Sequence, residues 1–198
     1  MHYYRLNIAG LTRYLPILPI SPELAIAGFV ILGDTKLVCA VAPLLAEQLP
    51  ETDFLLTAET KGIPLIQEMA RYMNLSRYMV ARKNVKLYMT DPISTSVKSI
   101  STAARQTLYL DRHDAERMRG KRVAIVDDVI STGDSLDALE TLVRQAGGEV
   151  VARACILAEG DAIDRPDLVY LQELPLIPLP VQVADPIVEL SVMDTLEI

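Results

Sequence analysis

Two hydrophobic periodicities alternate along the middle of the chain. Short, almost wholly apolar runs predict buried strands, whereas longer runs with apolar residues three or four positions apart predict helices that present one face to a core. The predicted strands cover residues 53–59, 77–82, 105–112, 123–128 and 149–158. The predicted helices cover residues 35–49, 63–73 and 135–147. Pro43 is expected to bend or break the first helix, and Gly147 ends the last one.

This alternation predicts an α/β fold. Strands that are apolar on both faces are typical of a parallel sheet with helices on each side, and ligands of such sheets bind beyond the carboxyl ends of the strands. Residues 1–34 differ, because glycine and proline break them into short strands, of which 24–32 is the clearest. We therefore expect a small β-rich N-terminal hood over 1–34 and a parallel-sheet core over 35–198.

Composition narrows the class of protein. The chain has 198 residues, of which 51% are hydrophobic and 23% charged, as in an ordinary globular protein. The net charge of −7 argues against a nucleic-acid-coating function, so no nucleic-acid partner is expected. Cys39 and Cys155 are expected to be buried, reduced thiols. No secretory signal and no membrane-length apolar run is found, so we expect a cytoplasmic protein without a membrane partner.

The stretch "VAIVDDVISTGDS" carries the candidate chemistry. Its loop, residues 131–135, precedes a predicted helix, where free amides and the helix dipole favour an anion, and Gly133 permits the positive φ that such loops need. Asp127 and Asp128, next to the loop, can accept hydrogen bonds from hydroxyl groups of the same ligand. A sugar phosphate would suit both parts, with its phosphate in the loop and its hydroxyl groups at the aspartates. The alternative interpretation is that the two aspartates cap the turn and Ser135 caps the helix.

The same stretch resembles the phosphoribosyl-pyrophosphate signature of the type I phosphoribosyltransferases. "LLTAETKGIPL" and "ARKNVKL" resemble two loops of the adenine branch of that family, and the resemblance runs from Asp53 to near Pro178. It implies the type I fold, with a Rossmann-like parallel sheet, and a flexible lid over about 84–105. It also implies transfer of a phosphoribosyl group to a purine in purine salvage, with adenine as the favoured base, Mg²⁺ held through substrate oxygens rather than by a protein metal site, and a homodimer.

The resemblance also implies residue roles. The ribose hydroxyls would be held by Asp127 and Asp128, the expected catalytic carboxylates. The 5-phosphate would be held by Ser131, Thr132, Gly133, Asp134 and Ser135. The pyrophosphate would be held by Thr60, Lys61 and Gly62, together with Arg82, Lys83 and Lys86.

Three departures from the adenine branch leave the base open. Asp134 places a carboxylate in the phosphate loop, where the branch usually has glycine. The lid lacks the glutamate of the branch, so Asp91 and Lys98 become its candidate residues. In the hood, only Leu11 and Arg13 loosely match the base-binding strand. Two alternatives therefore remain: another base, such as xanthine, guanine or orotate, or a regulator that senses phosphoribosyl pyrophosphate without catalysis, although residues 1–50 show no helix-turn-helix or basic cluster.

Overall fold

A computed structural model describes residues 1–97 and 106–190 of the chain. Its centre is a five-stranded sheet in the order β5-β4-β8-β9-β10, with every neighbouring pair parallel. The strands are β4 (Phe54–Ala58), β5 (Met79–Ala81), β8 (Arg122–Ile130), β9 (Glu149–Glu159) and β10 (Leu168–Leu174). The predicted α/β fold with a parallel sheet is confirmed.

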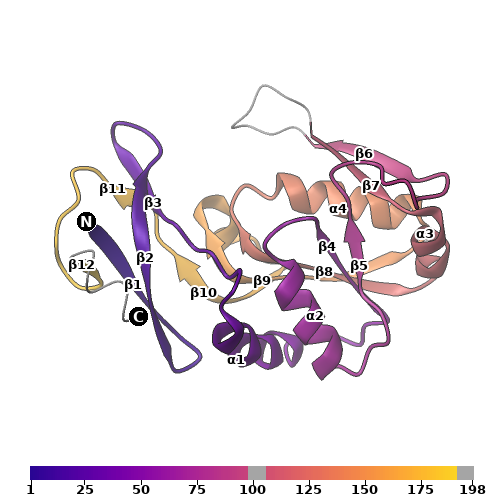
Figure 1. Cartoon of the computed structure of the whole chain (residues 1–198), viewed down its shortest axis with the longest axis horizontal. Coiled ribbons are helices and arrows are strands. Elements are labelled where there is room, and N and C mark those ends of the chain that lie inside the picture. Colours follow the sequence, from indigo (N-terminus) through magenta and orange to yellow (C-terminus); the bar gives the residue numbers. More distant parts are fainter. Residues whose placement is uncertain (98–105, 191–198) are drawn as a thin grey trace.

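Helices cover both faces of this sheet (Figure 1). On one side lie α1 (Thr35–Ala46) and α2 (Ile63–Tyr72); on the other lie α3 (Arg112–Met118) and α4 (Asp134–Gln145). The strand order reverses between β4 and β8, because the chain leaves β4 through α2 on one face and leaves β8 through α4 on the other. Such a reversal leaves a crevice at the carboxyl ends of the two strands, the usual ligand position in open α/β sheets.

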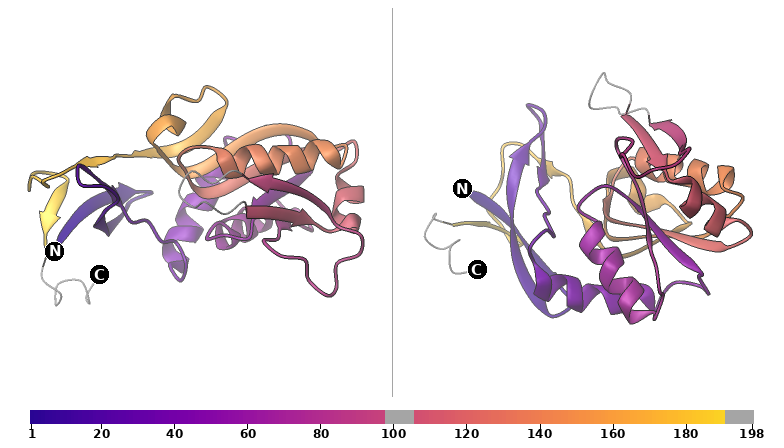
Figure 2. Two further views of the ribbon diagram at one scale, coloured as in Figure 1. Left: turned by 90° about the horizontal axis from the view of Figure 1, so that it is seen from above. Right: turned by 45° about the vertical axis from the view of Figure 1, so that its right-hand side comes forward.

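An antiparallel hood sheet lies beside the core, in the order β11-β3-β2-β1-β12. Its strands are β1 (His2–Ile8), β2 (Leu11–Pro19), β3 (Leu24–Ala27), β11 (Ile177–Pro178) and β12 (Ile187–Glu189). Figure 2 shows β12 alongside β1, a pairing made by His2 with Glu189 and by Tyr4 with Ile187. The expected hood of residues 1–34 thus also takes in strands from the C-terminal part of the chain, which the sequence assigned to the core.

The segment expected to form the lid contains a hairpin. Strands β6 (Ile93–Val97) and β7 (Gln106–Leu110) pair in antiparallel fashion, and β6 packs against α4 (Figure 1). Residues 98–105, which include the candidate Lys98, lie outside the described residues. Helix α3 follows the hairpin and was not expected from the sequence, because its run "RHDAERM" has too few apolar residues to show a helical stripe.

Several local expectations need correction. Strand β3 ends at Ala27 rather than at residue 32. Helix α1 continues through Pro43 without breaking, as far as Ala46. Cys155 is buried as expected, but Cys39 is exposed, because it lies on the face of α1 that does not pack on the core. Among the described helices, none is long and apolar enough to cross a bilayer.

Candidate functional site

The turn after β4 and the end of β8 meet where the strand order reverses. The Thr60 hydroxyl donates to Asp127 Oδ1 over 2.9 Å, and the Asp128 amide donates to the same oxygen over 3.0 Å. A Cβ added to Gly62 would lie 2.6 Å from that oxygen, so only glycine allows this approach. The backbone of Gly62 is ordinary, with φ −69°, and the requirement for glycine is therefore one of space. Four residues expected to bind one ligand, Thr60, Gly62, Asp127 and Asp128, are thus brought together from two distant parts of the chain.

The two aspartates lie in different surroundings. Burial, together with the neighbouring charge of Asp128, raises the pKa of Asp127 to about 7. Asp128 is only 3% exposed, and its Oδ2 lies 3.3 Å from Lys61 Nζ without the alignment of a hydrogen bond. The Lys61 ammonium instead donates to the backbone oxygen of Phe29 over 2.6 Å, which ties the segment that follows β3 to the site. Asp128 Oδ2 is therefore a buried acceptor that a ligand hydroxyl can satisfy.

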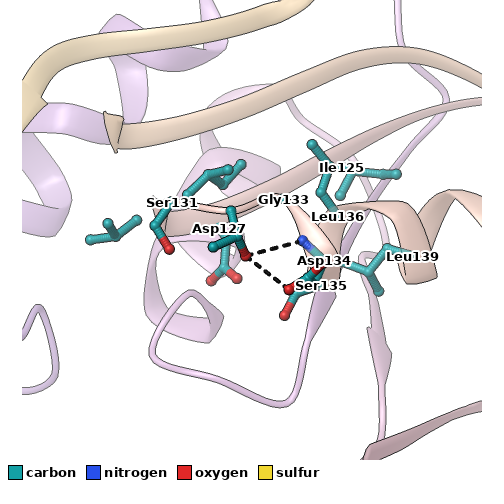
Figure 3. Close-up of a pocket in the computed structure, with 11 residues that line it drawn as sticks. Ile125, Asp127, Ser131, Gly133, Asp134, Ser135, Leu136 and Leu139 are labelled. Atoms are coloured by element: carbon teal, nitrogen blue, oxygen red, sulfur yellow. Dashed lines mark hydrogen bonds between the residues drawn. The ribbon is translucent and has the colours of Figure 1, made fainter. Parts of the chain in front are cut away.

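The loop between β8 and α4 encloses a small cavity of about 80 Å³ (Figure 3). Gly133 has φ 87° and precedes the first helical residue, and its backbone oxygen accepts from the amide of Asp137 over 2.9 Å. The Thr132 hydroxyl donates to Asp134 Oδ2 over 3.0 Å, so this carboxylate is held within the loop. Asp127, Ser131 and Ser135 also line the cavity, as Figure 3 shows. The five predicted loop residues therefore surround one hollow at the start of a helix, a geometry suited to a phosphate.

The predicted basic residues gather around one acid, Glu59. Its carboxylate accepts from the Lys83 amide over 2.9 Å and lies 3.0 Å from Arg82 Nη2 and 3.5 Å from Lys86 Nζ. These contacts, the amide hydrogen bond first, hold the pKa of Glu59 below its usual range. Glu59 directly precedes the Thr60 turn, so the cations lie near the same strand end as Asp127. Their contact with pyrophosphate stays a prediction.

The remaining candidate residues lie away from the Asp127 cluster in the described part of the chain. Arg13 forms a two-nitrogen ion pair with Asp34, the residue that caps α1, and Leu11 lies at the start of β2 in the hood. Asp91 lies at the base of the hairpin, where it pairs with Arg112. None of these contacts joins the Asp127 cluster, and the roles of Leu11, Arg13 and Asp91 stay predictions.

Two polar residues near the site were not predicted from the sequence. Thr57 is fully buried, and its hydroxyl has no hydrogen-bond partner among the described residues. A threonine inside the apolar strand β4 was the available signal. Glu159, the last residue of β9, has a pKa raised by burial and lies near Lys61. Within residues 1–97 and 106–190, no three His, Cys, Asp or Glu side chains gather as a metal site.

The fold and the site together define a class of protein. A phosphate-sized hollow lies next to two carboxylates that can hold hydroxyl groups, and a cluster of cations lies at the neighbouring strand end. This arrangement, at the reversal point of the parallel sheet of an α/β protein, is suited to a sugar phosphate that carries a second anionic group.

Residues 32–183 match the phosphoribosyl transferase domain, and the chain belongs to this family. It is 30% identical over 111 residues to a hypoxanthine/guanine phosphoribosyltransferase from Methanocaldococcus sp. (strain FS406-22), covering 56% of this chain and 53% of that protein. It is 29% identical over 136 residues to the purine biosynthesis transcriptional repressor PurR of Bacillus subtilis, covering 68% of this chain and 46% of the repressor. The chain therefore spans about half the length of each of these relatives.

The fold is also that of solved structures in the family. The adenine phosphoribosyltransferase from Thermoanaerobacter pseudethanolicus superposes with a TM-score of 0.66 at 20% identity, covering 80% of this chain and 95% of that one. The expected type I phosphoribosyltransferase fold, with a parallel core and a hood, is confirmed.

Proposed function

We propose that this protein transfers the 5-phosphoribosyl group of phosphoribosyl pyrophosphate to a purine base, releasing pyrophosphate and a nucleoside monophosphate. The observation that carries the proposal is the meeting of the Thr60–Gly62 turn with Asp127 beside the phosphate loop. In this proposal the arrangement would hold the three parts of the donor, pyrophosphate, ribose and 5-phosphate, next to one another. Adenine is the proposed base because two loops resemble the adenine branch.

The proposed chemistry is a displacement at C1 of the ribose. A ring nitrogen of the base bonds to C1 as the bond from C1 to the pyrophosphate oxygen breaks, and the proton of that nitrogen passes to water or to the departing pyrophosphate. Positive charge develops on the ribose as the leaving group departs. Asp127 and Asp128 would accept hydrogen bonds from the two ribose hydroxyls and stabilise that charge. The amides of residues 131–135 would hold the 5-phosphate in place while C1 reacts.

The pyrophosphate needs positive charge from several sources. In this proposal Lys61 leaves the backbone oxygen of Phe29 to contact the donor, while Glu59 keeps Arg82 and Lys86 oriented towards the same strand end. Mg²⁺ would be held through oxygens of the donor, with Asp127 and Asp128 as the available protein carboxylates, and would supply positive charge that favours departure of the pyrophosphate. The hairpin of β6 and β7 is proposed as the lid that excludes water.

A homodimer is part of the proposal. Val85, Leu87 and Tyr88 expose large apolar side chains in the loop that carries Lys83 and Lys86. A contiguous run of this kind is suited to a protein partner, and a second copy of the chain would cover it next to the site. Analytical ultracentrifugation of the wild-type chain and a Leu87→Asp variant tests this point: the wild type should be dimeric and the variant mainly monomeric.

Two alternatives rest on specific observations. The hypoxanthine/guanine relative favours a 6-oxopurine as the base, and the departures in the hood and lid also leave xanthine or orotate open. The similarity to the repressor, together with Asp134 in the phosphate loop, favours a protein that binds phosphoribosyl pyrophosphate without turning it over. In that case the same site would serve as a sensor.

One assay separates these possibilities. Pyrophosphate release is measured with phosphoribosyl pyrophosphate and Mg²⁺ against adenine, hypoxanthine, guanine, xanthine, uracil and orotate in turn. Release of pyrophosphate with adenine supports the proposal. If release occurs only with another base, the protein is a transferase for that base instead of adenine. Tight binding of phosphoribosyl pyrophosphate without release of pyrophosphate in the presence of any base supports the sensor. A double Asp127→Asn and Asp128→Asn variant should be inactive yet folded, and full activity in that variant would contradict the roles assigned to the pair.

A further inference from the structure

Arg165 places a guanidinium against the phosphate loop from the outside. The residue follows the short helix η1 (Gly160–Asp164), and its side chain is 26% exposed. A Cβ added to Gly133 would lie 2.7 Å from Arg165 Nη1 and 3.8 Å from its Cζ. The guanidinium therefore occupies the space that a side chain at position 133 would need. Gly133 is required by its positive φ, and a side chain at this position would also displace the end of this arginine.

A helix N-terminus is an unfavourable position for a cation, and neighbouring acids must offset that cost. The N-terminus of α4 carries partial positive charge, and basic side chains are normally stabilised at the other end of a helix. The acids that face Arg165 are Asp167, with both oxygens at 3.3 Å, and Asp137, at 3.8 Å. A guanidinium and a helix N-terminus that converge on the same loop raise the affinity of that loop for an anion.

A chain of ion pairs fixes the arginine. Asp167 Oδ2 also lies 3.2 Å from Arg153 Nε, and Arg153 contacts Glu140, which is only 6% exposed on α4. The pairs thus run from the middle of α4 through β9 to the segment before β10, and from there back to the start of α4. Buried Glu140 fixes Arg153, and Arg153 shares the partly exposed Asp167 with Arg165, so these pairs restrict the orientation of Arg165 before any ligand binds.

We infer that Arg165 is a positioning residue for the 5-phosphate site: it supports the loop at Gly133 and supplies positive charge that offsets Asp134. This inference rests on the proposed function and names a residue that lies outside the signature stretch. Neither the loop sequence nor its spacing indicates an arginine 32 positions beyond Gly133.

The test is calorimetric binding of ribose 5-phosphate, which needs neither a base nor turnover. Arg165→Gln should weaken binding at least tenfold, and Arg165→Lys should recover part of that loss because it keeps the charge. Binding to the wild type should weaken as NaCl is raised, and this dependence should be smaller in Arg165→Gln, since one cation is missing. Arg71→Gln is the matched control, because Arg71 is also paired with an acid, Glu68, but lies on α2.

The outcomes separate this inference from the proposed function. If the wild type binds ribose 5-phosphate and Arg165→Gln binds it within twofold, with an unchanged salt dependence, Arg165 has no such role. If the wild type itself does not bind, the proposed function is overturned first. If Arg165→Gln is destabilised, Asp167→Asn provides a second variant, which keeps Arg165 but removes its ion-pair partner. Its affinity for ribose 5-phosphate should fall threefold or more. An activity assay should show the loss mainly in KM for the donor rather than in kcat.

Discussion

Asp127 couples ligand binding to stability, and the coupling can be measured as a pH dependence. Its pKa in the folded protein is raised from 3.8 to about 7 by burial and by Asp128. Between about pH 4 and pH 7 the folded protein therefore keeps a proton that the unfolded chain releases. The free energy of unfolding must fall as the pH rises through this window. An asparagine side chain does not titrate, so the Asp127→Asn variant should escape this loss.

The size of the effect follows from the shift in pKa. One pKa unit corresponds to about 1.4 kcal/mol, which sets an upper limit of about 4 kcal/mol. Asp127 is partly exposed, and screening by water reduces the value to about 2 kcal/mol. For a chain of this length that corresponds to roughly 5 °C in Tm. The asparagine keeps an oxygen that can accept from Thr60 and from the Asp128 amide, so these hydrogen bonds are retained.

Urea unfolding followed by circular dichroism tests this at pH 4.5, 6, 7 and 8. Asp127→Asn should gain about 2 kcal/mol relative to the wild type between pH 4.5 and pH 8. Asp53→Asn is the control, because Arg122 holds the pKa of Asp53 below its usual range. The stability that Asp53 contributes is complete above about pH 4, so this variant should be less stable by a constant amount in all four buffers. A flat or falling difference for Asp127→Asn would refute the reasoning.

Further variants test the packing and the charges around the site. Gly62→Ala should lose about 1–3 kcal/mol in urea unfolding, because its Cβ would contact Asp127 at 2.6 Å; unchanged stability would mean that the turn yields. Glu140→Gln should lose about 3 kcal/mol in the same assay, because it leaves Arg153 without its buried partner, and a loss below about 1 kcal/mol would contradict that. Asp134→Asn should tighten calorimetric binding of ribose 5-phosphate roughly fivefold, the equivalent of about 1 kcal/mol, and weaker binding would show that this carboxylate organises the loop.

The parts of this protein that could be predicted from its sequence are those set by short-range patterns. Apolar runs define β4, β8 and β9, since such runs are stable only when buried on both faces. The change from apolar strand to hydroxyl-rich loop to amphipathic helix locates the phosphate loop within a few residues, and Gly133 has the positive φ that its position predicts. A helix with few apolar residues shows no such pattern, and α3 could not be predicted for that reason.

The assembly of the site depends on contacts between residues that are distant in sequence. Thr60 and Asp127 are separated by 67 positions, and they meet only because β4 and β8 are neighbours in the sheet. Three other features depend on such long-range contacts: Glu59 gathers the basic residues, β11 and β12 join the hood, and Arg165 approaches Gly133. Hydrophobic periodicity specifies which face of an element is buried. It does not specify which element covers that face, because burial of apolar surface is non-directional, and the choice of partner follows from strand order and packing over the whole chain.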